Sequence, residues 1–360
     1  MPLMKMDKYN QYIQRCFELA KNGRSKVSPN PLVGAVIVKD GRIISEGFHA
    51  HFGGLHAEAM AIKTAKESLV GATLFCNLEP CCHTNKKTPP CLPLVINSGI
   101  KRVVLSNSDP NPNVSGKSIK QMRDAGIEVV ENILKNEGQE LNRFFFKHIL
   151  ESKPWVTLKI AQTLNGMISK NKGAQTWITG AESGKFVHKL RAEFDAVLIG
   201  AGTVRSDNPQ LNVRHVDGKD PVKIVIDGKL SSDPEAKTFE AGTTWIFHNP
   251  SSEGSKSNWL QKANVRLFEC EEDNHRRISI KDVLRQLGNE GINSLLVEGG
   301  QNIFSQFVSQ QLFDEIIILQ APVFFKSGTS SIQLKNDFEL SIYESGILGE
   351  DNYLILRKKV

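Results

Sequence analysis

The first half of the chain is organised around His56-Ala57-Glu58, which is followed by Pro80-Cys81-Cys82-His83 and Thr88-Pro89-Pro90-Cys91. These segments offer an imidazole, several thiols and a carboxylate two residues after the imidazole. Zinc sites in proteins use such nitrogen and sulfur ligands, four in a structural site and three plus water in a catalytic one. His56, one of Cys81 or Cys82, and Cys91 would supply three ligands, which leaves Glu58 free to move protons.

The pattern H-x-E…P-C is the signature of zinc deaminases that act on amino-pyrimidines and amino-purines. Zinc lowers the pKa of water toward about 7, and Glu58 would carry the proton from water to the departing ammonia. Because the signature places a ligand directly after the proline, Cys81 is favoured over Cys82. Two alternatives remain, a chance grouping of core residues and a structural zinc site closed by His83, but neither gives Glu58 a role.

The gap between the two cysteines is unusual for this signature, which normally reads P-C-x-x-C. Here nine residues separate Cys81 from Cys91, and they include His83, Lys86 and Lys87. A polar, basic loop beside a metal is suited to holding a substrate phosphate. The insertion therefore indicates a phosphorylated ligand.

Charge is distributed unevenly along the chain. Residues 1–150 hold 20 Lys and Arg against 13 Asp and Glu, a formal charge of +7, whereas residues 151–360 carry −1. A basic half suits an anionic ligand, either a phosphate ester or nucleic acid. This half has no run of Lys and Arg longer than two residues and no interleaved aromatic pattern. We therefore predict a small phosphorylated substrate and no nucleic-acid partner.

The length of 360 residues suits two domains. Ser152-Lys153-Pro154 marks the predicted boundary, giving domains 1–150 and 151–360. Strands and helices alternate in both, which predicts α/β folds with mostly parallel sheets and helices on both faces; Lys39-Asp40-Gly41 predicts one hairpin.

Several features bear on where the protein works and how it associates. No apolar run approaches the roughly 20 residues needed to span a bilayer, and the first residues lack the apolar core of a signal peptide. The clustered cysteines fit a metal site in a reducing compartment better than a disulfide framework. These features predict a cytoplasmic protein without a membrane partner, and exposed strand edges favour a homo-oligomer.

Two glycine-rich turns stand out in the second half, Gly200-Ala201-Gly202-Thr203 after a strand and Glu298-Gly299-Gly300 between a strand and a helix. Helix N-termini bind phosphates, so two such turns in one sheet favour a dinucleotide site. The first is not the Rossmann G-x-G-x-x-G, because Arg205 occupies the last position. Each turn, taken alone, is also explained as a tight turn that requires glycine.

The motifs of the first half, taken together, resemble the deaminase half of the bifunctional riboflavin-biosynthesis deaminase/reductase family. The resemblance rests on the segments already quoted and on Asn30-Pro31-x-Val33-Gly34, Gly47-x-His49 and Asp109-Pro110-Asn111-Pro112. It implies a cytidine-deaminase-like α/β/α domain. It also implies that the substrate is a diaminopyrimidinone carrying a ribosylamino 5-phosphate. The residues implied to hold it are Asn30, His49, His83 and Lys87, or alternatively Lys86.

The second half resembles the reductase half of the same family, whose fold is similar to dihydrofolate reductase. The matching segments include Leu158-Lys159-x-Ala161, Trp177-Ile178-Thr179, Gly202-Thr203-Val204-x-x-Asp207 and Val297-Glu298-Gly299-Gly300. The resemblance implies that NADPH delivers hydride to C1′ of the ribosylamino group and opens it to a ribitylamino chain. The implied NADPH contacts are Ala161, Trp177, Thr203, Asp207, Gly300, Gln301 and Asn302. The implied substrate contacts are Gln175, Arg191, Leu211, Arg214 and Glu298, of which the two arginines suit bidentate phosphate binding.

The chain departs from the family pattern at Asn165. Leu164-Asn165-Gly166 stands where the family usually has Leu-Asp-Gly. An amide carries no charge, so no acid/base role is expected there. Two other functions fit the sequence less well. A nucleic-acid deaminase with an appended domain fits poorly with the insertion and the −1 second half, and a non-catalytic zinc module gives Glu58 no role.

Overall fold

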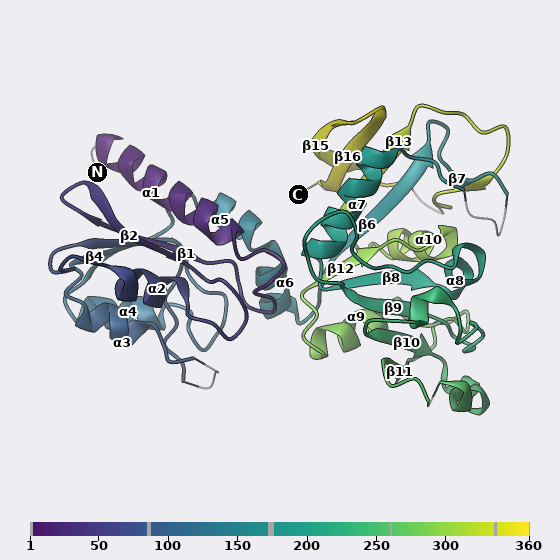
Figure 1. Cartoon of the computed structure of the whole chain (residues 1–360), viewed down its shortest axis with the longest axis horizontal. Coiled ribbons are helices and arrows are strands. Elements are labelled where there is room, and N and C mark those ends of the chain that lie inside the picture. The colour runs from purple at the N-terminus through teal and green to yellow at the C-terminus, as the bar shows by residue number, and fades with distance from the viewer. Residues whose placement is uncertain (1–2, 85–87, 172–175, 260, 335–336, 360) are drawn as a thin grey trace. The chain divides into compact units, whose positions relative to one another are not determined.

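The structure is a computed structural model that describes residues 3–84, 88–171, 176–259, 261–334 and 337–359. The chain divides into two compact units, Met1–Glu151 and Ser152–Val360 (Figure 1). No helix in the described part of the chain combines the length and apolar character needed to span a membrane.

The first unit contains a five-stranded sheet in the order β2-β1-β3-β4-β5. The strands are β1 (Gly34–Lys39), β2 (Arg42–Phe48), β3 (Thr73–Leu78), β4 (Arg102–Asn107) and β5 (Glu128–Val130). Strand β1 runs antiparallel to both β2 and β3, whereas β3, β4 and β5 are parallel. The sheet is therefore mixed rather than mostly parallel as predicted. The hairpin is the cause, since Asp40 and Gly41 both adopt positive φ, as a tight two-residue hairpin turn requires.

Helices cover both faces of this sheet (Figure 1). They are α1 (Leu3–Lys21), α2 (Ala57–Thr64), α3 (Leu92–Asn97), α4 (Lys117–Asp124), α5 (Lys135–Leu141) and α6 (Arg143–Glu151). Helix α1 packs on one face through Ile13 and Phe17, and α2, α3 and α4 pack on the other through Ala61, Val95 and Met122. Helices α2 and α3, which begin next to His56 and Cys91, therefore lie on the same face of the sheet.

The second unit contains a nine-stranded sheet in the order β11-β10-β9-β8-β12-β6-β13-β16-β15. The strands are β6 (Trp155–Thr163), β8 (Ala196–Gly200), β9 (Val222–Ile226), β10 (Thr244–His248), β11 (Val265–Glu269), β12 (Ser294–Val297), β13 (Glu315–Ala321), β15 (Leu340–Leu348) and β16 (Asp351–Lys358). The strands from β11 to β13 are parallel, and β16 and β15 are added antiparallel at one edge. A separate two-stranded sheet pairs β7 (Met167–Ser169) with β14 (Thr329–Ser330).

The parallel part of this sheet is buried on both faces, as parallel sheets usually are. Along β8, Leu198 joins the core under the helices α9 (Ile280–Asn289) and α10 (Gln301–Ser309). Its neighbours in sequence, Val197 and Ile199, point the other way and pack near Trp259. The remaining helical segments are α7 (Ala181–Glu193), α8 (Ala201–Asp207), η1 (Lys237–Phe239) and η2 (Pro250–Asn258).

The strand order contains a switch point. From β6 the chain passes to β8, continues outward to β11, and then returns so that β12 lies between β8 and β6. Ligands in open α/β sheets bind beyond the carboxyl ends of strands at such a switch. The segments that leave β8 and β12 there are the two glycine-rich turns singled out in the sequence.

Candidate active sites

A compact group of three metal-binding side chains lies in the first unit. The ligand atoms of His56, Cys81 and Cys91 all lie within 4.8 Å of one another. His56 caps the N-terminus of α2, Cys91 caps that of α3, and Cys81 follows the end of β3. A glycine is needed at residue 47 of β2, because a Cβ there would lie 2.4 Å from the carbonyl oxygen of Ala57.

The geometry of this group fits zinc. His56 Nδ1 lies 3.4 Å from Cys81 Sγ, and the backbone N–H of Cys91 donates to the same sulfur over 3.4 Å. Zn–S bonds of about 2.3 Å and Zn–N bonds of about 2.0 Å in a tetrahedron put ligand atoms roughly 3.5 Å apart. Cys81 and Cys91 are also tied together by the bond from Leu92 N to Cys81 O, at 3.1 Å. The three side chains can therefore hold a zinc ion with little rearrangement.

The structure separates Cys82 from this group, because its sulfur lies 3.6 Å from the carbonyl oxygen of Asn113. His83 is half-buried and is not one of the three grouped residues in the described chain. Thr88 instead contacts the ligand histidine, with Oγ1 3.1 Å from His56 Nε2. A ligating imidazole normally uses its second nitrogen for such a hydrogen bond, which fixes its tautomer.

Acidic side chains surround the group. Glu58 is buried on the first turn of α2, two residues after His56. Burial raises the pKa of Asp109 to about 7, with the negative charges of Glu79, Cys81 and Glu58 adding to the effect. In the sequence, Asp109 stands out only as part of the motif Asp109-Pro110-Asn111-Pro112, which predicts no role for it. Its position could have been recognised from the sequence, because Asp109 follows the predicted strand at residues 102–106 and sites in parallel sheets lie at such strand ends.

Glu79 is a second residue that the sequence did not single out. Its carboxylate accepts four backbone N–H groups, from Asp109, Gly116, Ser118 and Ile119, at 3.0–3.2 Å. These bonds tie the end of β3 to the first turn of α4. Glu79 therefore holds in place the turn that presents Cys81.

Two predicted substrate residues meet beside the metal group. Asn30 Nδ2 lies 3.0 Å from His49 Nε2, and His49 Nδ1 lies 2.9 Å from the carbonyl oxygen of Leu55. A carbonyl only accepts, so His49 carries its proton on Nδ1 and accepts from Asn30. The rings of His49 and His56 are 5.2 Å apart. The loop lysines Lys86 and Lys87 lie outside the described residues.

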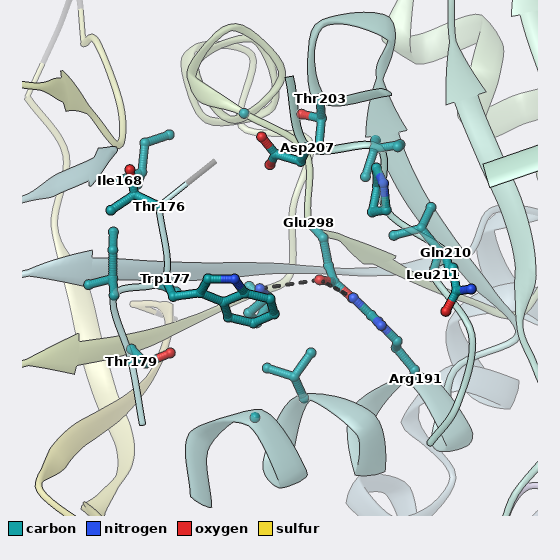
Figure 2. A pocket seen from close by; sticks show the side chains of 18 of the residues that line it. Ile168, Thr176, Trp177, Thr179, Arg191, Thr203, Asp207, Gln210, Leu211 and Glu298 are labelled. Carbon is teal, nitrogen blue, oxygen red and sulfur yellow. Dashed lines mark hydrogen bonds and ion pairs between the residues drawn. The ribbon is translucent and has the colours of Figure 1, made fainter. Parts of the chain in front are cut away.

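In the second unit, a cavity of about 520 Å³ lies at the switch point of the sheet (Figure 2). It is lined by segments that are distant in sequence: β6, α7, α8, the loop after α8, and the start of α10. The cavity brings together nine of the predicted contacts, namely Ala161, Trp177, Arg191, Thr203, Asp207, Leu211, Arg214, Glu298 and Gly300. Gln301 and Asn302 follow at the start of α10 but do not line it, and Gln175 lies outside the described residues.

One carboxylate occupies the centre of this cavity wall (Figure 2). Glu298 is bound by both nitrogens of the Arg191 fork, at 2.6 and 3.0 Å, and by Lys159 Nζ at 3.2 Å. Burial alone would raise the pKa of Glu298, but the charges of Arg191 and Lys159 lower it to about 2. Lys159 was quoted in the sequence motif without a role. A lysine within an apolar strand is the signal that identifies it.

The second glycine-rich turn lies close to the backbone of the neighbouring strand. A Cβ at Gly299 would lie 2.9 Å from Ile199 Cα, so only glycine lets the chain after β12 lie this close to the end of β8. Gly300 then caps α10 next to Thr203. Free backbone N–H groups at a helix N-terminus bind phosphates, and the side chain of Trp177 is 82% exposed at the cavity wall. A phosphate cradle and an exposed ring fit a dinucleotide such as NADPH.

Asn165 has a structural role. Its side chain donates to the carbonyl oxygen of Phe325 over 2.8 Å and accepts from the N–H of Phe325 over 3.2 Å. A carboxylate could accept but not donate, so only an amide satisfies both backbone groups. Asn165 thereby fixes the segment after β13, which agrees with the expectation that it is no acid or base.

Comparison with known proteins matches both units. The cytidine and deoxycytidylate deaminase zinc-binding region matches residues 6–107, and the RibD C-terminal domain matches residues 154–350. The riboflavin biosynthesis protein RibD of Aquifex aeolicus is 40% identical over 349 residues, covering 97% of this chain and 93% of that one. Its counterpart in Actinobacillus pleuropneumoniae is 37% identical over 350 residues, covering 94% and 93%.

The chain belongs to the RibD family. Solved structures agree. The deaminase/reductase of Thermotoga maritima is 37% identical, with a TM-score of 0.86, and it covers 99% of this chain and 100% of its own. Acinetobacter baumannii RibD is 31% identical, with a TM-score of 0.89 and the same coverage.

As a RibD protein, the chain is a bifunctional enzyme of riboflavin biosynthesis, a zinc-dependent deaminase and an NADPH-dependent reductase. The family, the fold class, the two activities and both cofactors predicted from the sequence are thereby confirmed. The roles assigned to individual site residues stay predictions.

Proposed function

We propose that this RibD catalyses two consecutive steps. The first is hydrolytic deamination of 2,5-diamino-6-(5-phosphoribosylamino)pyrimidin-4-one to the uracil, and the second is reduction of its ribosyl group to ribityl. The observation that carries the proposal is the group of His56, Cys81 and Cys91 with Glu58 on the first turn of the helix that His56 begins. The full-length match to the Thermotoga maritima enzyme, described as a deaminase and reductase for these compounds, supports the choice of substrate.

In the first unit, His56, Cys81 and Cys91 hold the zinc. When bound there, zinc supplies a Lewis acid that lowers the pKa of water to about 7. Glu58 takes a proton from the attacking water and delivers it to the amino group, which leaves as ammonia.

Substrate binding in the first unit uses groups around this centre. His49, held by Asn30 in one tautomer, positions the pyrimidine. His83 and a lysine of the inserted loop, Lys87 or Lys86, bind the phosphate.

In the second unit, NADPH supplies the hydride. When bound, its phosphates would be held at the turn from Gly300 to Asn302 beside Thr203. Ala161, Asp207 and Trp177 would provide the remaining contacts. With these contacts, the cofactor would lie along the cavity wall that the two glycine-rich turns form.

The substrate of the second unit contacts Leu211, Glu298 and Gln175. Arg214, which is exposed at the cavity, binds its phosphate. Arg191 has its fork bound to Glu298 and Nη1 bound to the carbonyl oxygen of Asn212, at 3.2 Å. We therefore assign Arg191 to orienting Glu298 and Lys159 toward the substrate, rather than to the phosphate.

We also propose a cytoplasmic homo-oligomer. All six cysteines are free, as expected in a reducing compartment. The edge strand β15 exposes Ile342 and Ile347. Exposed apolar strand edges favour pairing with another chain, so we place an association surface at this edge.

The test supplies the zinc-loaded, full-length enzyme with the diaminopyrimidinone phosphate, with and without NADPH, and follows ammonia and NADPH absorbance separately. We expect ammonia release in both reactions and NADPH consumption only after ammonia appears. The deaminated uracil compound, given directly, should consume NADPH without ammonia. NADPH consumption before any ammonia, or no ammonia from zinc-loaded enzyme, would contradict the proposal.

A further inference from the structure

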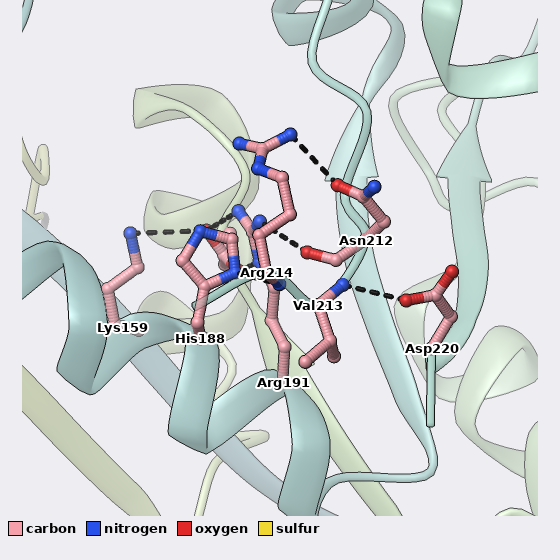
Figure 3. A network of polar contacts seen from close by, with 8 residues as sticks. Lys159, His188, Arg191, Asn212, Val213, Arg214 and Asp220 are labelled. Carbon is pink, nitrogen blue, oxygen red and sulfur yellow. Dashed lines mark hydrogen bonds and ion pairs between the residues drawn. The ribbon is translucent and has the colours of Figure 1, made fainter. Parts of the chain in front are cut away.

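Three consecutive residues after α8, Asn212 to Arg214, are each anchored from outside their own segment (Figure 3). The anchors are the hydrogen bonds Arg191 Nη1 to Asn212 O (3.2 Å), Val213 N to Asp220 Oδ1 (2.7 Å) and Arg214 N to His188 Nδ1 (3.0 Å). The segment carries Arg214, the proposed phosphate contact of the reductase. Its position therefore depends on these three bonds.

The bond to His188 constrains the protonation state of the imidazole. A backbone N–H can only donate, so Nδ1 must hold a free lone pair and His188 must be neutral, with its proton on Nε2. Among the three anchoring side chains, the arginine stays charged in proteins. Histidine alone changes state near neutral pH, so the anchor at Arg214 is the one that responds to mild acid.

His188 is buried on α7 and lines the cavity. The charged groups around it are Arg191 on its own helix, Arg214 and His215 on the anchored segment, and Glu298 after β12, with Lys159 of β6 beyond. Burial lowers the pKa of His188, and so do its interactions with Arg191, Arg214 and His215, while Glu298 opposes them. The neutral form required by the hydrogen bond is therefore also the one that the surroundings favour.

We propose that neutral His188 is a positioning residue of the reductase, which holds the backbone of Arg214 so that its guanidinium meets the substrate phosphate. Protonation of His188 removes the acceptor and releases the segment, which weakens substrate binding in acid. This inference rests on the proposed phosphate role of Arg214. The added positive charge of His188 would act in the opposite direction on an anionic substrate, so the sign of the change in KM distinguishes the two effects.

The test measures reductase KM and kcat of the full-length enzyme with the deaminated uracil substrate, from about pH 8 to about pH 5.5, for three variants. His188→Asn places an oxygen where Nδ1 was but does not titrate, His188→Leu removes the acceptor, and His215→Asn removes the neighbouring histidine as a matched control. Comparing variants at each pH cancels the titration of the substrate phosphate.

We expect the substrate KM of the wild type to rise by about three- to tenfold in acid relative to His188→Asn, as for one lost hydrogen bond. His188→Leu should show the high KM at every pH. His215→Asn should keep the acid rise in KM, displaced toward higher pH because a neighbour that lowers the pKa of His188 is removed, with kcat little changed throughout. A His188→Asn profile identical to the wild type, or a wild-type KM in His188→Leu, would overturn the proposal.

A second measurement does not depend on turnover. In nitrogen NMR of the wild-type chain, with the signal assigned by its loss in His188→Asn, Nδ1 should be unprotonated at about pH 8. The Arg214 amide should shift together with the His188 titration. A protonated Nδ1 at that pH would refute the anchor, whereas absent NADPH turnover with this NMR result intact would count against the proposed function alone.

Discussion

The two sites are assembled over very different spans of sequence. The zinc group and Glu58 lie within residues 56–91, at two helix N-termini and one strand end. The reductase cavity is lined by residues from Lys159 to Phe304, contributed by strands that are neighbours only in the folded sheet. The first site is therefore a local arrangement that short motifs can specify, and the second is a product of topology.

The sites also differ in how they balance charge. In the first unit, thiol and carboxyl groups surround the predicted metal site, and a bound zinc ion would balance their negative charge. In the second, Glu298 is already matched by Arg191 and Lys159. Removing an acid should thus disable chemistry in the first unit and destabilise the framework in the second.

The largest effect is expected from Glu58→Gln. Without a proton carrier, ammonia release should fall by about 10²–10⁴-fold, while zinc content stays near one per chain because the three ligands are intact. Reduction of the deaminated substrate should be unchanged. Glu67→Gln, a half-exposed acid beyond the same helix, is the control. Near-normal ammonia release by Glu58→Gln would remove Glu58 from the mechanism.

The next effect concerns stability. Glu298→Gln leaves two cations without their buried partner, which should lower the free energy of unfolding by about 3–5 kcal/mol. All four tryptophans lie in the second unit, so denaturant titration followed by tryptophan fluorescence reports on that unit. Glu290→Gln, which breaks the more exposed pair with Arg266, should cost about 1 kcal/mol or less.

The Glu298→Gln effect should also depend on pH with a defined sign. The pKa of Glu298 is depressed from an ordinary 4.5 to about 2. Its contribution to stability is therefore complete above the ordinary value and is lost as the pH falls toward 2. If the two variants lost equal stability at neutral pH, the buried pairing would not be the source of the difference.

The same contrast explains what the sequence could predict. The spacing of His56, Cys81 and Cys91 identified the metal group because all three lie within residues 56–91, two at helix starts and one after a strand end. The two glycine-rich turns were found for the same reason. The sequence predicted no role for Lys159, because its ion-pair partner Glu298 is distant in sequence. An ion pair between residues on different parallel strands has no signature in the local sequence.

The roles of two further side chains could not be predicted from the sequence, because their hydrogen-bond partners are backbone atoms. Glu79 is defined by the four N–H groups it accepts, and Asn165 by the two groups of Phe325 that it satisfies. Backbone partners have no residue identity, so no motif marks them. Strand β15 was likewise missed, since its residues are largely exposed and lack the alternation that indicates a half-buried strand.

A smaller effect, on zinc affinity, tests whether the zinc motif includes Thr88 in addition to the three predicted ligands. Thr88→Val removes the hydroxyl 3.1 Å from His56 Nε2, and loss of such an outer partner typically weakens metal binding by about 10–100-fold. Competition with a chelator measures this directly. Thr88→Ser keeps the hydroxyl and should bind zinc nearly as the wild type does. Equal affinities for Val and Ser variants would show that the ligand geometry is set by the helix starts alone.

The smallest effect is expected at the cofactor side of the reductase. Trp177 is 82% exposed, so Trp177→Ala should leave the unfolding free energy almost unchanged. Loss of its proposed contact with NADPH should raise the KM for NADPH by about three- to tenfold, as for one aromatic contact, with deamination unaffected. Trp177→Phe retains a ring and should recover most of the affinity. A normal KM for NADPH in Trp177→Ala would move the cofactor away from this wall of the cavity, and with it the assignment of Trp177.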